Sequence, residues 1–210
     1  MAVTLYYIHD PMCSWCWAFR EIYEDIVVNL PDDVKVKRLL GGLAADTEED
    51  MSEDMQSYIK HQWQSIQEKL PGIEFNFDFW DKCKPKRATY SACRAVISAN
   101  NQGNDYDEIM TLAIQQGYYL HARNPSDQDT LIAFANELNL NEEQFTRDLF
   151  SADTNETLKQ QINLSRQLGA AGFPSMLLET NGNIIQIPTN YLNSKEMLVE
   201  IQNNLLHLSE

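Results

Sequence analysis

The chain has 210 residues, of which 43% are hydrophobic, and it carries a formal net charge of −15. Its length and composition predict a soluble protein with one elaborated domain, or a domain with an insertion. Acidic residues are dense at 46–54 and 127–156, which disfavours binding to nucleic acid or to an anionic membrane surface. No stretch approaches the ~20 apolar residues that a membrane-spanning helix needs.

The first forty residues predict a strand, a helix and a second strand. Residues 3–9 are rich in β-branched and aromatic side chains, which favours a buried strand. After Asp10-Pro11, apolar residues recur at helical spacing from about residue 13 to residue 30. Residues 34–40 first alternate and then become apolar, as a strand entering a core does. This order is that of a βαβ unit.

A long helical region follows. We expect helices at about 51–70, 85–101 and 105–120, because apolar residues recur there every three or four positions. Ser126 is the expected N-cap of a fourth helix running to residue 138, and Asn141 is the expected N-cap of a fifth. A sixth helix is expected at about 154–168. Their Met and aromatic residues are typical of core-facing stripes.

The last part of the chain predicts a hairpin and a helix. The helical pattern stops at 169–172, and strands are expected at 176–179 and 184–187, joined by a tight turn at Asn181-Gly182-Asn183. An amphipathic helix is expected at 194–208. The whole order is βαβ, a block of helices, then ββα, so the sequence predicts an α/β fold with a helical insertion.

Cys13-Ser14-Trp15-Cys16 stands between the first strand and the first helix. That context distinguishes a redox motif from a chance pair of cysteines. Residues three apart share the first helical turn, where the orphan N–H groups and the helix dipole stabilise a thiolate on Cys13. We expect Cys13 to be the exposed attacking sulfur and Cys16 to be the shielded thiol that resolves the mixed disulfide.

The residues around this pair have less specific expected roles. Trp15, between the cysteines, is expected to be partly exposed and to contact the substrate. His9, Asp10 and Ser14 are candidates for tuning the site electrostatically, with a purely structural role as the alternative.

The alternatives to redox chemistry are a zinc site and an inert cysteine pair. Zinc usually takes four ligands, but the chain has no second Cys-x-x-Cys, and its histidines, at positions 9, 61, 121 and 207, are isolated. We therefore predict no metal. Cys83 precedes a predicted helix and Cys93 lies about two turns inside it, too far apart for a disulfide. Cys93 is expected to be buried and Cys83 to be a free thiol, with a regulatory second pair as the alternative.

The segment from Asp10 to Cys16, set between a strand and a helix, resembles the DsbA family of thioredoxin-fold oxidoreductases. It most resembles the FrnE-like, predicted protein-disulfide isomerase branch, whose motif tends to carry Trp before the second Cys. The resemblance covers nearly the whole chain and implies a thioredoxin-like domain at 1–43 and 170–210, with an inserted helical domain at 44–169. It also implies that Pro174 is a cis-proline facing the active site, and that Phe173 before it pairs with bound substrate.

The resemblance implies a DsbA-like protein-disulfide oxidoreductase or isomerase that exchanges disulfides through Cys13 and Cys16. Its partners would be protein or small-molecule disulfides and thiols, together with an unidentified redox partner. No tightly bound cofactor is implied, and glutathione or another thiol is a possible co-substrate. The N-terminus does not read as a signal peptide, which predicts a cytoplasmic location.

Two other functions stay open. One is a glutathione-dependent isomerase or transferase of the kappa or hydroxychromene-carboxylate type, which shares the helical insertion. In it the turn at 39–43 would line a small-thiol pocket. The other is a chaperone or binding module that uses the helical block.

Overall fold

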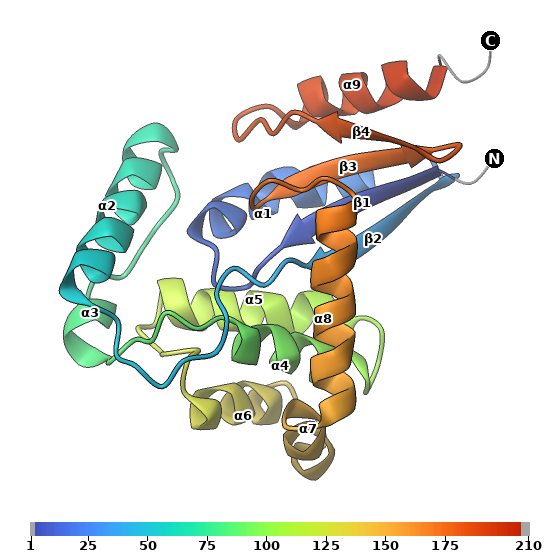
Figure 1. Cartoon of the computed structure of the whole chain (residues 1–210). Coiled ribbons are helices and arrows are strands. Elements are labelled where there is room, and N and C mark those ends of the chain that lie inside the picture. The colour runs from blue at the N-terminus through green and yellow to red at the C-terminus, as the bar shows by residue number, and fades with distance from the viewer. Residues whose placement is uncertain (1–2, 207–210) are drawn as a thin grey trace.

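A computed structural model describes residues 3–206. A four-stranded sheet lies at its centre, in the order β2-β1-β3-β4. The strands are β1 (Val3–His9), β2 (Val34–Leu40), β3 (Ser175–Thr180) and β4 (Asn183–Ile187). β1 pairs parallel to β2 and antiparallel to β3, and β3 pairs antiparallel to β4. The two ends of the chain therefore share one sheet (Figure 1).

Helices cover both faces of this sheet. On one face, α1 (Ser14–Val28) and α9 (Ser194–Leu206) bury their apolar sides against Leu5 and Tyr7 of β1. On the other face, Tyr6 and Ile8 pack beside Leu164, which belongs to α8 (Ala152–Gln167). Successive side chains of a strand point to opposite faces, so β1 is buried on both sides.

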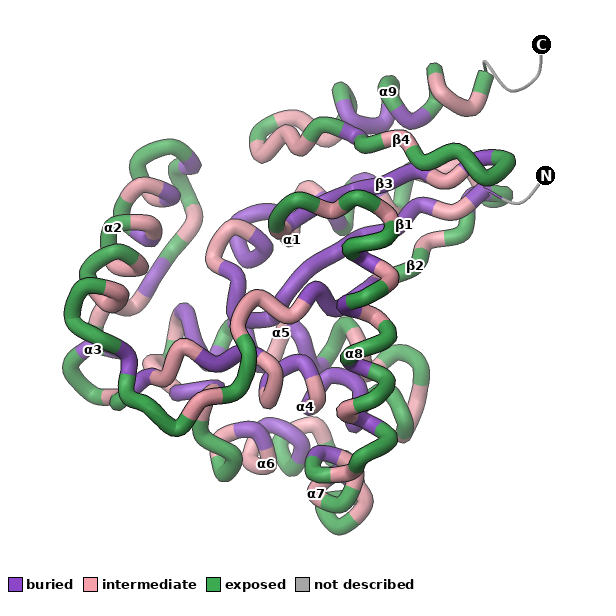
Figure 2. Tube along the Cα trace, viewed as in Figure 1, coloured by how far each residue is buried: buried purple, intermediate pink, exposed green. Residues whose placement is uncertain are grey.

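Between β2 and β3 the chain is helical. Ahead of α8 come α2 (Glu53–Lys69), α3 (Phe79–Lys82), α4 (Tyr90–Asn100), α5 (Tyr106–Tyr119), α6 (Gln128–Glu137) and α7 (Glu142–Leu149). Their apolar faces form a second core around Trp63, Phe79, Tyr119 and Phe134. α2 stands at the side of the molecule with an exposed outer face (Figures 1 and 2). The predicted fold class, with helices inserted between βαβ and ββα, is confirmed. The domain boundaries near residues 43 and 170 stay a prediction.

The hairpin turn and the last helix can be compared with the elements predicted for them from the sequence. Asn181 and Gly182 both have positive φ, 51° and 80°, as a two-residue turn between twisted strands requires. The helix expected at 194–208 ends at residues 207 and 208, which lie outside the described residues. Within residues 3–206, no helix combines the length and the apolar character needed to cross a membrane.

One helix was not expected, and the starts of three others differ from the expected ones. α3 is a single turn, too short to show a periodic pattern. α4 begins at Tyr90 and not near residue 85, because Lys86 pairs with Asp50 in an isolated β-bridge. The N-cap of α6 is Asp127, one residue after the expected Ser126, and it makes no side-chain cap. α8 begins two residues early, because Ser151 caps it.

Candidate active site

The two cysteines of the motif lie within one helical turn. Cys13 is the N-cap residue of α1, and its Sγ accepts a hydrogen bond from the backbone N–H of Cys16 at 3.3 Å. The first turn of α1 contains no acidic side chain. The positive end of the α1 dipole therefore lies at the Cys13 sulfur.

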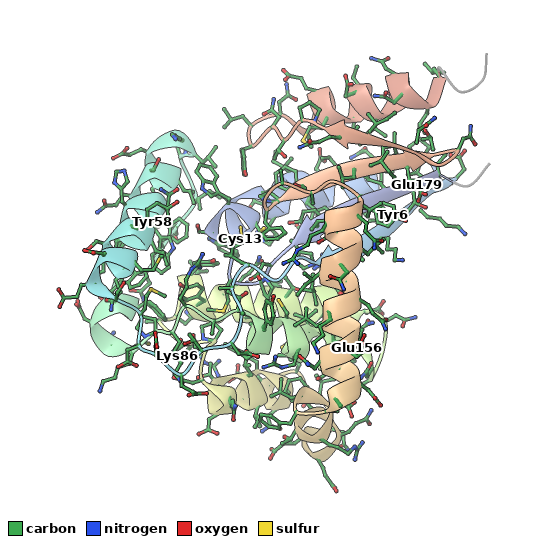
Figure 3. All side chains as sticks on the ribbon, in the orientation of Figure 1. Tyr6, Cys13, Tyr58, Lys86, Glu156 and Glu179 are labelled. Atoms are coloured by element: carbon green, nitrogen blue, oxygen red, sulfur yellow. The ribbon has the colours of Figure 1, made fainter. Side chains whose placement is uncertain are left out.

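The expectation that Cys13 is exposed was wrong. Cys13 is 6% exposed and Cys16 is 1% exposed. Cys13 lines a cavity of about 450 Å³, together with Trp15, Phe173 and the side chain of Tyr58 from α2. Figure 3 shows Cys13 between the sheet and α2, with Tyr58 and Lys86 on segments far away in the sequence. The sulfur is thus reached through a cavity, because residues from distant segments wall it.

Cys16 is held in its protonated form. Burial raises the pKa of the Cys16 thiol well above its ordinary value, and the hydrogen bond and charge of Cys13 raise it further. The pair therefore consists of one sulfur at a helix N-terminus inside a cavity and one protonated thiol behind it.

The segment before β3 faces Cys13. The Phe173–Pro174 peptide bond is cis, and the carbonyl oxygen of Phe173 accepts a hydrogen bond from the Cys13 thiol at 3.6 Å. The Phe173 ring lies against Gly41, where an added Cβ would come within 1.9 Å of the Cε1 atom of the ring. Glycine at position 41 therefore allows the segment before β3 to approach the turn after β2.

Asp10 connects the site to two other segments. It is fully buried, and its carboxylate accepts hydrogen bonds from the N–H of Met12 at 2.8 Å and the N–H of Leu43 at 2.7 Å. It also accepts from the hydroxyl of Thr89 at 2.7 Å and the thiol of Cys93 at 3.5 Å. Burial raises the pKa of Asp10, and these hydrogen bonds oppose the rise. Asp10 thus joins the loop before Cys13 to the turn after β2 and to α4.

The other predicted site residues lie on different sides of the pair. Trp15 is half-buried. The centroid of its ring lies 5.0 Å from the centroid of the Tyr191 ring and 5.7 Å from the Nζ atom of Lys69. Ser14 is half-buried and lines the cavity beside Cys13. His9 is absent from that cavity and is 1% exposed, with its ring stacked on Tyr7 at 5.0 Å.

The remaining cysteines are separate thiols. Cys93 is buried and bonds to Asp10, whereas the Cys83 thiol donates to the carbonyl of Ala122 at 3.2 Å. Residues 3–206 contain no cluster of three His, Cys, Asp or Glu side chains arranged to hold a metal ion.

Sequence reasoning missed the basic residues of the cavity. Lys86, Arg87 and Arg166 line it, and no acidic residue does. Lys86 pairs with Glu48 at 2.6 Å, whereas within the described part of the chain Arg87 and Arg166 have no carboxylate partner within 4 Å. A net charge of −15 gives no signal of such a site, since the three residues come together only in the fold.

A dithiol at the start of the first helix, facing a cis-proline segment in a βαβ-ββα sheet, defines a protein of the thioredoxin fold. A family model described as Thioredoxin matches residues 6–199. The chain belongs to the thioredoxin family.

Solved structures with DsbA-like folds are similar over the whole chain. A candidate protein disulfide isomerase from Nitrosomonas europaea is 26% identical with a TM-score of 0.84, covering 100% of both chains. The cytosolic disulfide reductase DsbM from Pseudomonas aeruginosa is 24% identical with a TM-score of 0.76, covering 96% of this chain and 98% of that one. DsbM has also been solved with GSH. These neighbours confirm the DsbA-like thioredoxin fold predicted from the sequence.

One curated relative is named as an adapter protein and not as an oxidoreductase. The ClpXP adapter protein SpxH from Halalkalibacterium halodurans is 22% identical over 187 residues, which cover 83% of this chain and 58% of that protein. The chain therefore spans less than three fifths of the length of this relative.

Proposed function

We propose that the chain is a thiol–disulfide oxidoreductase in which Cys13 attacks and Cys16 resolves. The observation that carries this is the position of the Cys13 sulfur, which lines a cavity at the N-terminus of α1 with Cys16 one turn behind it. The Cys13 thiolate attacks a substrate disulfide, forms a mixed disulfide and releases one thiolate. Cys16 then attacks Cys13, forms the Cys13–Cys16 disulfide and releases the second thiol, after which an external thiol reduces the pair.

Substrate binding is assigned to Trp15, Phe173 and Pro174. The backbone carbonyl of Phe173 accepts a hydrogen bond from Cys13, and an extended substrate segment would pair with this backbone. Trp15 supplies an aromatic wall beside the attacking sulfur. Trp15, directly before the second cysteine, supports membership of the FrnE-like branch, and the likeness to cytosolic DsbM supports a cytoplasmic location.

Glutathione is the proposed small co-substrate. Each glutathione moiety carries two carboxylates, and Arg87 and Arg166 line the cavity with no acidic neighbour in its lining. The likeness to DsbM, which has been solved with GSH, supports the same choice. Since this charge pattern also fits a glutathione-dependent isomerase or transferase, that function is the second candidate.

Reduction of insulin by dithiothreitol, measured as turbidity above the uncatalysed rate, separates these functions. Cys13→Ser and Cys16→Ser should each abolish catalysis, and Cys83→Ser, which removes a thiol outside the cavity, should stay within about twofold of wild type. Reductase activity that survives in Cys16→Ser contradicts the dithiol mechanism and favours the glutathione-dependent alternative. Activity that survives in both active-site variants contradicts any redox role for the pair.

A further inference from the structure

Lys86 lies between the substrate cavity and a second hollow, of about 550 Å³. Among the described residues, it is the one that lines both spaces, and Figure 3 shows it below Cys13. The charged residues in the lining of the substrate cavity are all basic. The second space is an acidic hollow, whose lining includes the carboxylates of Asp46, Glu48, Asp127 and Asp129. The Lys86 side chain thus borders two spaces of opposite charge.

The backbone of Lys86 is held on two sides. It pairs with Asp50 in an antiparallel bridge, and its carbonyl accepts a hydrogen bond from the Ser126 hydroxyl at 3.4 Å. The preceding carbonyl, of Pro85, accepts from the N–H of Met51 at 2.8 Å. Lysine carries its ammonium on a flexible four-carbon stem. The ammonium can therefore change its partner by rotation of the side chain alone.

In this structure the ammonium is paired on the acidic side. Its Nζ atom donates to the Glu48 carboxylate at 2.6 Å, and this hydrogen bond raises the pKa of Lys86. The charges of Asp50 and Asp127 raise the same pKa to a smaller extent. The Glu48 side chain is 97% exposed. Because water solvates and screens an exposed ion pair, little free energy holds the two partners together. Another carboxylate can therefore replace that of Glu48.

We propose that Glu48 competes with the substrate for Lys86: it holds the ammonium before the substrate binds, and a carboxylate of the substrate then takes its place. This rests on the proposed function and adds Lys86 to the residues that select an anionic disulfide or thiol. No covalent bond changes in the exchange. Lys86 adds to binding only for a substrate with a carboxylate that reaches it, because the Glu48 pair has to be broken first.

The neighbouring charges favour the exchange. Arg87 lines the same cavity directly beside Lys86 in the sequence, so a substrate carboxylate meets a second cation there. A carboxylate inside the cavity is also less hydrated than that of Glu48, and its attraction to the ammonium is screened less. In the acidic hollow, Arg94 keeps its bidentate pair with Asp46, at 2.7 and 3.1 Å. The hollow therefore does not lose all its positive charge when the ammonium of Lys86 leaves.

Calorimetric titration with S-methylglutathione measures this binding without redox chemistry, since the ligand keeps both carboxylates of glutathione and has no free thiol. Glu48→Gln should lower its Kd about two- to fivefold, the range that the free energies of exposed ion pairs allow. Glu49→Gln is the matched control, because it removes the same charge from the next exposed position and leaves the Lys86–Glu48 pair intact. Its Kd should stay within about 1.5-fold of wild type.

A double-mutant cycle separates the exchange from a general effect of charge. Lys86→Met keeps an unbranched side chain without the ammonium and should raise the Kd at least about twofold. In that background Glu48→Gln should change the Kd by less than about 1.5-fold. A Glu48→Gln variant that binds no more tightly than wild type, an equal tightening with and without Lys86, or a wild type that does not bind the ligand overturns the inference. The proposed function fails separately, if Cys16→Ser still reduces insulin, and that failure leaves the binding result standing.

Discussion

Replacing Asp10 by alanine should destabilise the protein by about 3 kcal/mol. The backbone N–H groups of Met12 and Leu43 lose their only acceptor and cannot turn to another, at about 1–3 kcal/mol each. The Thr89 hydroxyl already lies 3.4 Å from the carbonyl of Ala44, and the Cys93 thiol is a weak donor, so these two add little. Burial disfavours the charged carboxylate and raises its pKa, so removing it relieves a desolvation cost and offsets part of the lost free energy of unfolding.

Urea unfolding of the reduced protein, followed by tryptophan fluorescence, measures this difference. A thermal melt gives a second measure. At about 2–4 °C per kcal/mol for a chain of this size, the melting temperature of Asp10→Ala should be about 6–12 °C below that of wild type. Asp32→Ala, at an exposed position, is the matched control and should change the free energy of unfolding by less than about 0.5 kcal/mol. An Asp10→Ala variant within about 1 kcal/mol of wild type would refute the role of this hydrogen-bond network.

Three further predictions follow from the same structure. Gly41→Ala should lower both insulin reductase activity and the melting temperature, because its Cβ displaces the Phe173 ring. If this collision is the cause, adding Phe173→Ala should recover the melting temperature. Because burial lowers the pKa of His9 in the folded state, the unfolded state binds more protons below pH 6.5. When the pH is lowered from 7.5 to 5.5, the free energy of unfolding should therefore fall by about 1.4 kcal/mol more for wild type than for His9→Gln. Equal falls for the two proteins, measured by urea unfolding at each pH, contradict this. Arg166→Glu should raise the KM for oxidised glutathione several-fold, with a weaker salt dependence than wild type, and an unchanged KM contradicts the charge argument.

Much of the fold was predictable because the apolar pattern along each segment reports its burial. The sequence predicts a buried strand at residues 3–9, and β1 occupies those residues. The start of α4 was not predictable from that pattern. The Lys86 backbone pairs with Asp50, thirty-six positions earlier, and this long-range pairing overrides a locally helical sequence.

The site was predictable only where it is local. The spacing of Cys13 and Cys16 places both on one helical turn, whatever the rest of the chain does. The burial of Cys13 depends on Phe173, which lies 160 positions away. Three of the four donors to Asp10, and the arginines of the cavity, also come from distant segments. No local pattern signals such contacts.

The position of Trp15 has a consequence for protein engineering. Redox proteins of this kind invite exchange of the two residues between the cysteines as a way to change the reduction potential. Here one of those two residues also contacts Gln62 and Lys69 of α2 and Tyr191 near α9. A smaller residue at position 15 would therefore loosen α2, which walls the substrate cavity, at the same time as it changed the chemistry of the pair. Electrochemical and conformational effects will be separable only if Trp15 is kept and Ser14 alone is varied.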